Sequence, residues 1–223
     1  MTIDLIIQGI LKIVIGFIII GLLLFVPAGT IAYWNGWLLL KTIFIPMFIL
    51  GIVLLIGNPK LLMKRLNAKE KQEEQKNVIR MSGLMFILGF IIAGLNYRFG
   101  WIFLPRTISN IAAIIYIIEF ILYAEVLREN EYLSRTVEIQ KDQKVIDTGL
   151  YSIIRHPMYS ITIIMFLMIP LILGSISSFI IFLCYPAILI KRIKNEEELL
   201  EKDLKGYKEY QKKVKYKLIP WIW

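Results

Sequence analysis

Two polar runs in the second half of the chain hold the residues best suited to bind a charged small molecule. The first run, Gly149–Tyr159, contains the only histidine of the chain, His156, between an arginine and a proline. The second run places Arg192 four residues before Glu196. A guanidinium grips a carboxylate or a phosphate with two parallel hydrogen bonds, and a carboxylate can bind an ammonium group. The two runs therefore predict a site for a charged small molecule.

An apolar hairpin joins the two runs. Its segments, Met158–Leu173 and Ser175–Ile190, are separated only by Gly174. Each segment is shorter than the roughly 20 residues that usually cross a bilayer, so the sequence allows either a full crossing or a re-entrant hairpin. The hairpin returns the chain to the membrane face from which it started. Both polar runs are therefore expected on the same face, at a boundary between lipid and water.

Four more apolar segments precede the hairpin and reach or approach the length of a membrane span. They are Leu5–Val26, Trp37–Ile56, Met81–Leu95 and Ile108–Leu127. Hydrophobic residues make up 57% of the chain, against about 45–50% in an ordinary globular domain. The predicted fold class is all-α, a polytopic membrane helical bundle with about six membrane segments, a C-terminal helical hairpin and a cytosolic site.

The net charge of +9 is distributed as expected for a membrane protein. Segments 58–80, 128–156 and 191–223 carry seven, five and ten Lys/Arg residues, whereas segments 27–36 and 96–107 carry none and two. Cytoplasmic loops of membrane proteins are enriched in these residues. We therefore expect both termini in the cytoplasm. The basic excess would face anionic lipid headgroups, and it does not indicate a nucleic-acid partner.

The composition also argues against several kinds of site. One histidine and one cysteine, Cys184, cannot build a zinc site, and no carboxylate cluster has the spacing of a calcium loop. We therefore expect no metal. In addition, no glycine-rich phosphate loop follows a strand pattern, which disfavours a soluble nucleotide-binding fold.

The chain becomes polar again after Ile190, and this change predicts a charged helix that ends near Gly206. A stripe of apolar residues follows, at the spacing of a helix that lies on a membrane or docks on its own domain. The stripe consists of Tyr207, Tyr210 and Val214. Trp221 and Trp223 are typical of an aromatic anchor at the membrane interface.

An ordered set of motifs runs along nearly the whole chain and is densest from Asp147 to the end. The motifs are Pro27-Ala28-Gly29-Thr30, Asn58-Pro59, Tyr97-Arg98-Phe99-Gly100-Trp101, Arg155-His156-Pro157-x-Tyr159, Glu196-Glu197-x-x-Leu200, Gly206-Tyr207-Lys208-Glu209-Tyr210 and Leu218-Ile219-Pro220-Trp221. In these residues the chain resembles the isoprenylcysteine carboxyl methyltransferase and phospholipid methyltransferase superfamily. It is most similar to prokaryotic members of unassigned substrate.

This resemblance implies an integral-membrane enzyme of a prokaryotic cell membrane that uses S-adenosylmethionine and gives S-adenosylhomocysteine. It implies a catalytic pair, Arg192 at the acceptor and Glu196 at the cofactor. The positions that match the family's cofactor contacts are Val145, Ile146, Tyr151, His156, Pro157, Met158, Tyr159, Glu196 and, as the second member of the glutamate pair, Glu197. One departure stands out, because Gln143 or Lys144 occupies the place where relatives often have a histidine.

Each of these residues also has a simpler interpretation. His156 could begin a helix with Pro157 at its first position. Arg192 and Glu196 could form an exposed helical ion pair worth about 0.3–0.5 kcal/mol. Glu119 lies inside an apolar segment, where a carboxylate costs roughly 2.5–3.5 kcal/mol or more. We therefore expect Glu119 to face the interior of the bundle and to have a partner there.

The residues and the resemblance together favour methyl transfer to a lipophilic acceptor that enters from the lipid bilayer, most of all a carboxylate. A phospholipid amine remains open as the acceptor, as does a nicotinamide-dependent membrane reductase. A non-catalytic transporter or scaffold is the alternative from another class of protein. We expect one integrated domain, with transmembrane helices in residues 1–128 and the methyltransferase core in residues 129–223.

Overall fold

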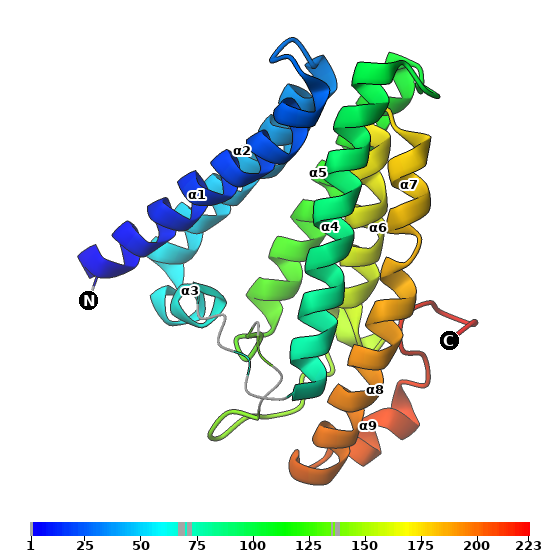
Figure 1. The fold of residues 1–223 in the computed structure, drawn as a ribbon. Helices are drawn as coiled ribbons and strands as arrows, with labels where there is room; N and C mark the ends of the chain where they lie inside the picture. The colour runs from blue at the N-terminus through cyan, green and yellow to red at the C-terminus, as the bar shows by residue number, and fades with distance from the viewer. Residues whose placement is uncertain (1, 67–69, 71–72, 135, 137–138) are drawn as a thin grey trace.

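The computed structural model describes every residue of the chain except 1, 67–69, 71–72, 135 and 137–138. The described residues form a bundle of helices, and their only β-pairing is an isolated bridge between Phe103 and Ser175 (Figure 1). The helices are α1 (Thr2–Ala28), α2 (Trp34–Gly57), α3 (Pro59–Leu66), α4 (Glu73–Phe99), α5 (Arg106–Glu129), the 3-10 helix η1 (Gly149–Ser152), α6 (Pro157–Ile172), α7 (Ile176–Phe182), α8 (Tyr185–Asp203) and α9 (Tyr207–Lys213).

The length and composition of the helices confirm the predicted membrane bundle. Five helical stretches are long and apolar enough to cross a bilayer, and the fifth, Ile176–Asp203, joins α7 to α8. Helix α6 is apolar but has only 16 residues. The chain is therefore an integral membrane protein in which the apolar helix α6 is shorter than the five candidate spans.

The break in the last crossing element lies where the sequence analysis did not expect it. We expected a span that ends at Ile190 and then a separate charged helix. In the structure, α7 ends at Phe182, and α8 runs without interruption from Tyr185 into the charged segment. Pro186 in the first turn of α8 explains the break, because a proline ring clashes with the carbonyl four residues earlier.

Helices α1 and α2 form a hairpin that leans on the rest of the bundle mainly through α4. Helices α1 and α4 approach closely at Gly94 of α4, where a Cβ atom would lie 2.6 Å from the carbonyl oxygen of Leu24. Most of α1 is exposed in the isolated chain, as expected for a helix that faces lipid. Gly94 therefore sets how near α1 can approach the bundle.

A polar lock holds the end of α6 that lies far from the two polar runs. The last carbonyl groups of a helix lack partners within the helix. Here the Tyr33 hydroxyl donates to the Leu173 carbonyl at 2.6 Å, and the Asn35 amide donates to the Ile172 carbonyl at 2.8 Å. Ser109, near the start of α5, donates to the Leu171 carbonyl at 3.1 Å. The far end of α6 is thereby tied to α2 and α5.

The start of α6 lies deeper in the bundle than the end of α5. Helix α6 has 16 residues and α5 has 24, so α6 is roughly 12 Å shorter at a rise of 1.5 Å per residue. Because the far ends of the two helices meet, the start of α6 at Pro157 is recessed relative to the end of α5. The His156 motif therefore lies deeper inside the bundle than the end of α5.

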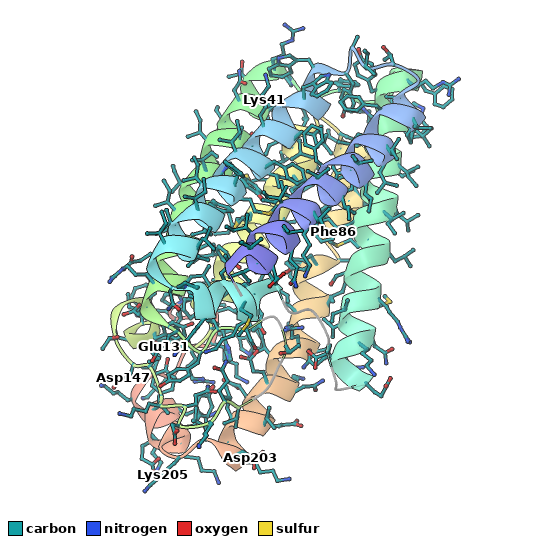
Figure 2. All side chains as sticks on the ribbon, turned by 90° about the vertical axis from the view of Figure 1, so that its left-hand side faces the viewer. Lys41, Phe86, Glu131, Asp147, Asp203 and Lys205 are labelled. Atoms are coloured by element: carbon teal, nitrogen blue, oxygen red, sulfur yellow. The ribbon has the colours of Figure 1, made fainter. Side chains whose placement is uncertain are left out.

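The remaining polar segments gather at the end of the bundle that contains the start of α6. Figure 1 shows α3, α9 and both chain termini in this lower half, and Figure 2 shows Glu131, Asp147 and Lys205 there. Asn58 ends α2 and Pro59 begins α3, as predicted. The two tryptophans expected as a membrane anchor differ from each other. Trp221 is 84% exposed, whereas Trp223 packs on the main core.

Glu119 also differs in part from the expectation. The residue is half-buried in α5, and its Oε2 atom is buried but finds no hydrogen-bond partner among the residues that the structure describes. Glu119 does not line the cavity described below.

The orientation in the membrane can be tested with single cysteines in a Cys184→Ser background. Ile31, between α1 and α2, is 74% exposed, and Lys212 in α9 is also exposed. We predict that a membrane-impermeant maleimide labels Ile31→Cys in intact cells and labels Lys212→Cys only after lysis, because the basic segments face the cytoplasm. Labelling of Lys212→Cys from outside would reverse the orientation.

Candidate functional site

A cavity opens at the end of the bundle where α6 begins. Its walls come from the segment between α5 and η1, the start of α6, one face of α8, and α9. Arg192 and Glu196 line it from successive turns of the same face of α8, as their spacing predicts. The other lining residues are Asn130, Tyr132, Leu133, Ser134, Thr136, Gln143, Lys144, Val145, Ile146, Tyr151, Arg155, His156, Met158, Tyr159, Leu199, Leu200, Leu204, Tyr207 and Tyr210.

Most residues singled out in the sequence meet at this cavity. Those that line it are Val145, Ile146, Tyr151, His156, Met158, Tyr159, Arg192 and Glu196. Two do not line it. Pro157 is buried in the first turn of α6, where it begins the helix, and Glu197 is buried behind the wall. Gln143 and Lys144, which replace the histidine of relatives, do face the cavity.

Glu197 is the centre of a buried ionic cluster. Its Oε1 atom accepts from Arg155 Nε at 2.7 Å and lies 3.2 Å from His156 Nε2, and its Oε2 atom lies 2.5 Å from Lys217 Nζ. Both carboxylate oxygens are therefore occupied by positive or hydrogen-donating groups. In this structure Glu197, expected as a cofactor contact, lies behind the cavity wall and holds Arg155 and His156 in place.

The contact with Glu197 also fixes how His156 can act. A carboxylate only accepts hydrogen bonds, so the hydrogen on the imidazole must be on Nε2 for this contact. A neutral imidazole then has an unprotonated Nδ1. The His156 ring is stacked with Tyr159 at a centroid distance of 5.7 Å. His156 therefore lines the cavity in an orientation that its contact with Glu197 fixes.

The segment after α9 closes the back of the site. The backbone amides of Arg155 and His156 donate to the carbonyls of Tyr216 and Lys217 at 2.9 and 3.0 Å. The Arg155 guanidinium also donates to the carbonyls of Val214 and Lys215 at 2.8 and 2.9 Å. The residues before α6 are thus clamped by the C-terminal segment, which the sequence had suggested only as a membrane anchor.

Tyr159 joins the two residues expected to do the chemistry. Arg192 Nε donates to the Tyr159 hydroxyl at 2.8 Å, and that hydroxyl donates to Glu196 Oε2. Arg192 also lies over the Tyr159 ring, 5.9 Å from its centroid. The charge of Glu70 acts on Arg192 as well. One phenol therefore fixes the relative positions of a cation and an anion on the cavity wall.

Tyrosines form the opposite side of the cavity. Asn130 donates to the Tyr151 hydroxyl at 3.0 Å, and the Tyr210 hydroxyl donates to the Tyr151 carbonyl at 2.6 Å. Burial raises the pKa of Tyr151, Tyr207 and Tyr210 above the usual value, so their hydroxyls stay neutral hydrogen-bonding groups. The predicted stripe of α9 therefore docks on its own domain, where it packs with Leu204, Val145 and Leu200.

Gly149 allows the chain to turn into the site. Its φ is +47°, and a Cβ atom there would lie 2.2 Å from the Glu129 carboxylate oxygens. Glu129 in turn accepts from Thr148 at 2.9 Å. Only glycine adopts such a backbone conformation at little cost. This turn delivers Tyr151 to the cavity.

Comparison with known proteins adds one finding. Residues 111–202 match the model of the isoprenylcysteine carboxyl methyltransferase (ICMT) family. This stretch runs from α5 to the end of α8 and contains Arg192, Glu196 and His156. No curated protein matches the chain. The match supports the resemblance to this superfamily.

The ionic cluster generates a prediction about stability. Glu197→Gln leaves the Arg155 guanidinium, which is only 8% exposed as a residue, without its carboxylate. Loss of one partner of a buried ion pair typically costs about 3–5 kcal/mol. We expect a clearly lower melting temperature for purified Glu197→Gln in detergent, and no change for Glu198→Gln, whose side chain is exposed. Equal melting temperatures would show that the cluster does not support the fold.

Proposed function

We propose that the protein transfers a methyl group from S-adenosylmethionine to a lipophilic acceptor, most of all to a carboxylate. The observation that carries this proposal is the junction of Arg192 and Glu196 at the Tyr159 hydroxyl. It gives the cavity an anion-binding and a cation-binding residue side by side, within the stretch that matches the methyltransferase family. Methyl transfer needs a cationic donor and an electron-rich acceptor next to each other.

The residues around the cavity fit such a cofactor. S-adenosylmethionine supplies a methyl group activated by a sulfonium, together with an ammonium, a carboxylate and an adenine. Glu196 has a second oxygen, Oε1, that makes no hydrogen bond among the described residues, and it is suited to an ammonium group. The Tyr207 hydroxyl and Asn130 can hydrogen-bond to the polar groups. The apolar surface suited to the adenine comes from Val145, Ile146, Met158, Leu199 and Leu200.

The main task of these residues is alignment. In the transfer, a new bond forms between the acceptor oxygen and the methyl carbon while the bond from carbon to sulfur breaks, with its electron pair left on sulfur. Holding two reactants in line can supply roughly 7–11 kcal/mol of barrier reduction. Tyr159 ties the cation that would hold the acceptor to the anion that would hold the donor. We therefore assign Tyr159 the role of holding Arg192 and Glu196, and with them the acceptor and the donor, at fixed relative positions.

A carboxylate acceptor agrees best with the groups present. A carboxylate is already a nucleophile near pH 7 and has no proton to lose, whereas an ammonium acceptor must first be deprotonated. Two side chains on the cavity wall could act as that base, His156 through Nδ1 and Glu196, which already accepts from Tyr159, but a carboxylate acceptor needs neither. Arg192, by contrast, is suited to a carboxylate, which it can hold at two points.

The position of the site suggests separate routes for the two substrates. The start of α6 is recessed inside the bundle, while the cavity is also lined by polar segments at the end of the molecule. A water-soluble cofactor would enter from the aqueous side. A lipophilic acceptor would keep its chain in the bilayer and enter between helices, with its polar end at Arg192.

The role of Glu196 can be tested by cofactor binding. Glu196→Ala removes the carboxylate that would pair with the ammonium group, and a hydrogen bond to a charged group is worth about 1.5–3 kcal/mol. We expect the affinity for S-adenosylhomocysteine to fall by at least about tenfold. Glu198→Ala is the matched control, because Glu198 is exposed on another face of α8. Equal affinities of the two variants would contradict the assignment.

The role of Arg192 can be tested by turnover. Lysine keeps the charge but loses the planar fork, so an acceptor held at one point is less well aligned. We predict that Arg192→Lys lowers methyl transfer to membrane lipid extract by about tenfold or more, with little change in S-adenosylhomocysteine affinity. Mass spectrometry of the labelled product would distinguish a methyl ester from a methylated amine. Lost cofactor affinity with normal turnover at saturating donor would place Arg192 with the cofactor instead.

A further inference from the structure

Arg65 is a cation near the candidate site that the proposed mechanism does not use. It lies on α3, an eight-residue helix whose Leu61 is buried and whose Lys60 and Met63 are exposed. The Arg65 guanidinium is half-buried and lies 5.6 Å from the centroid of the Tyr123 ring. A short amphipathic helix of this kind is suited to the surface of a bilayer.

The contacts of Arg65 lead directly to the cavity wall. Its Nη1 atom donates to the carbonyl of Ser134 at 3.1 Å, and Ser134 lines the cavity. Its Nη2 atom donates to the Tyr123 hydroxyl on α5. Within the described part of the chain, Arg65 forms no ion pair with a carboxylate. Its charge is therefore met only by neutral oxygens, and a guanidinium has five N–H groups to donate.

Hydroxyl-bearing residues lie on the helices that carry Arg192 and the partner of Arg65. They are Tyr123 on α5, Tyr159 and Thr162 on α6, and Tyr185 on α8. The Tyr123 hydroxyl accepts from Arg65, and the Tyr159 hydroxyl accepts from Arg192 at 2.8 Å. These polar groups lie among helices that otherwise bury apolar side chains.

We propose that Arg65 is an anion-capture residue of the acceptor site, so that the acceptor is an anionic amphiphile with a carboxylate or a phosphate at its polar end. Arg65 binds this group where it leaves the lipid headgroup region, before the group reaches Arg192. The inference rests on the proposed function, because it assigns the route of the same acceptor. It makes Arg65 a specificity-determining residue, distinct from the residues that align the methyl group.

Anion binding explains a guanidinium at position 65 better than a purely structural role does. A strut between α3 and Ser134 needs only a hydrogen-bond donor, as Lys64 shows by donating to the carbonyl of Glu131 at 3.0 Å. A guanidinium adds a second function, because it is weakly hydrated and binds carboxylates and phosphates with a rigid fork. We therefore expect the binding preference of the protein to depend on Arg65.

The test compares amphiphiles that differ in charge. Purified full-length protein in dodecyl maltoside is titrated with oleate, with dioleoyl phosphatidate and with neutral oleamide, and binding is followed by microscale thermophoresis. S-adenosylhomocysteine affinity is measured on the same samples. The variants are Arg65→Gln and Arg65→Lys, with Lys60→Gln as the control for charge on the same helix. Tyr123→Phe is a second route to the same effect, because it removes the hydroxyl that holds Arg65.

We expect the unmodified protein to bind at least one anionic amphiphile about tenfold more tightly than oleamide, in line with the strength of charge-assisted hydrogen bonds. Arg65→Gln should abolish this preference, Arg65→Lys and Tyr123→Phe should reduce it, and Lys60→Gln should keep it. The larger effect, on oleate or on phosphatidate, identifies the headgroup. S-adenosylhomocysteine affinity should not change in any variant.

Two results would overturn the inference. One is an unmodified protein that binds oleamide as tightly as both anionic amphiphiles. The other is an Arg65→Gln variant that keeps the full preference for the anion. In either case, intact binding of S-adenosylhomocysteine would leave the proposed function standing, whereas failure of the unmodified protein to bind it would count against the proposed function itself.

Discussion

The candidate site depends on one buried carboxylate, that of Glu197. A single side chain on α8 holds Arg155 and His156 at the start of α6 and Lys217 in the C-terminal segment. These three elements are distant in sequence, and apolar packing between them is not directional. Ionic hydrogen bonds are directional, so the cluster sets the angle between α6 and α8. That angle in turn decides whether Tyr159 reaches both Arg192 and Glu196.

A second constraint acts from the far end of the bundle. Tyr33, Asn35 and Ser109 satisfy the last carbonyls of α6 and anchor it to α2 and α5. With its far end fixed, the short helix must start inside the bundle. The two constraints thus have different effects. The hydrogen bonds at the far end of α6 set the depth of the site, and the Glu197 cluster sets the orientation of the side chains in it.

The sequence predicted the elements better than the contacts between them. Apolar length identified the membrane segments, and spacing placed Arg192 and Glu196 on one face of a helix. The break at Leu183 is not visible in the hydropathy pattern, because it comes from the clash of the Pro186 ring with a carbonyl of the preceding turn. The function of Glu197 could not be foreseen, because its partners lie about 20 to 40 residues away in the chain. The contacts of Arg65 could not be predicted either, because its approach to Tyr123 depends on how α3 packs against α5.

The account assigns the cavity to S-adenosylmethionine, and isothermal titration calorimetry of the purified full-length protein tests that assignment most directly. S-adenosylhomocysteine and NADPH are titrated separately into protein in the same detergent, with buffer as the blank. The account predicts saturable heat for S-adenosylhomocysteine with about one site per chain, and none for NADPH beyond the blank. Saturable binding of NADPH without binding of S-adenosylhomocysteine would indicate a reductase, and binding of neither would contradict an enzyme site at this cavity.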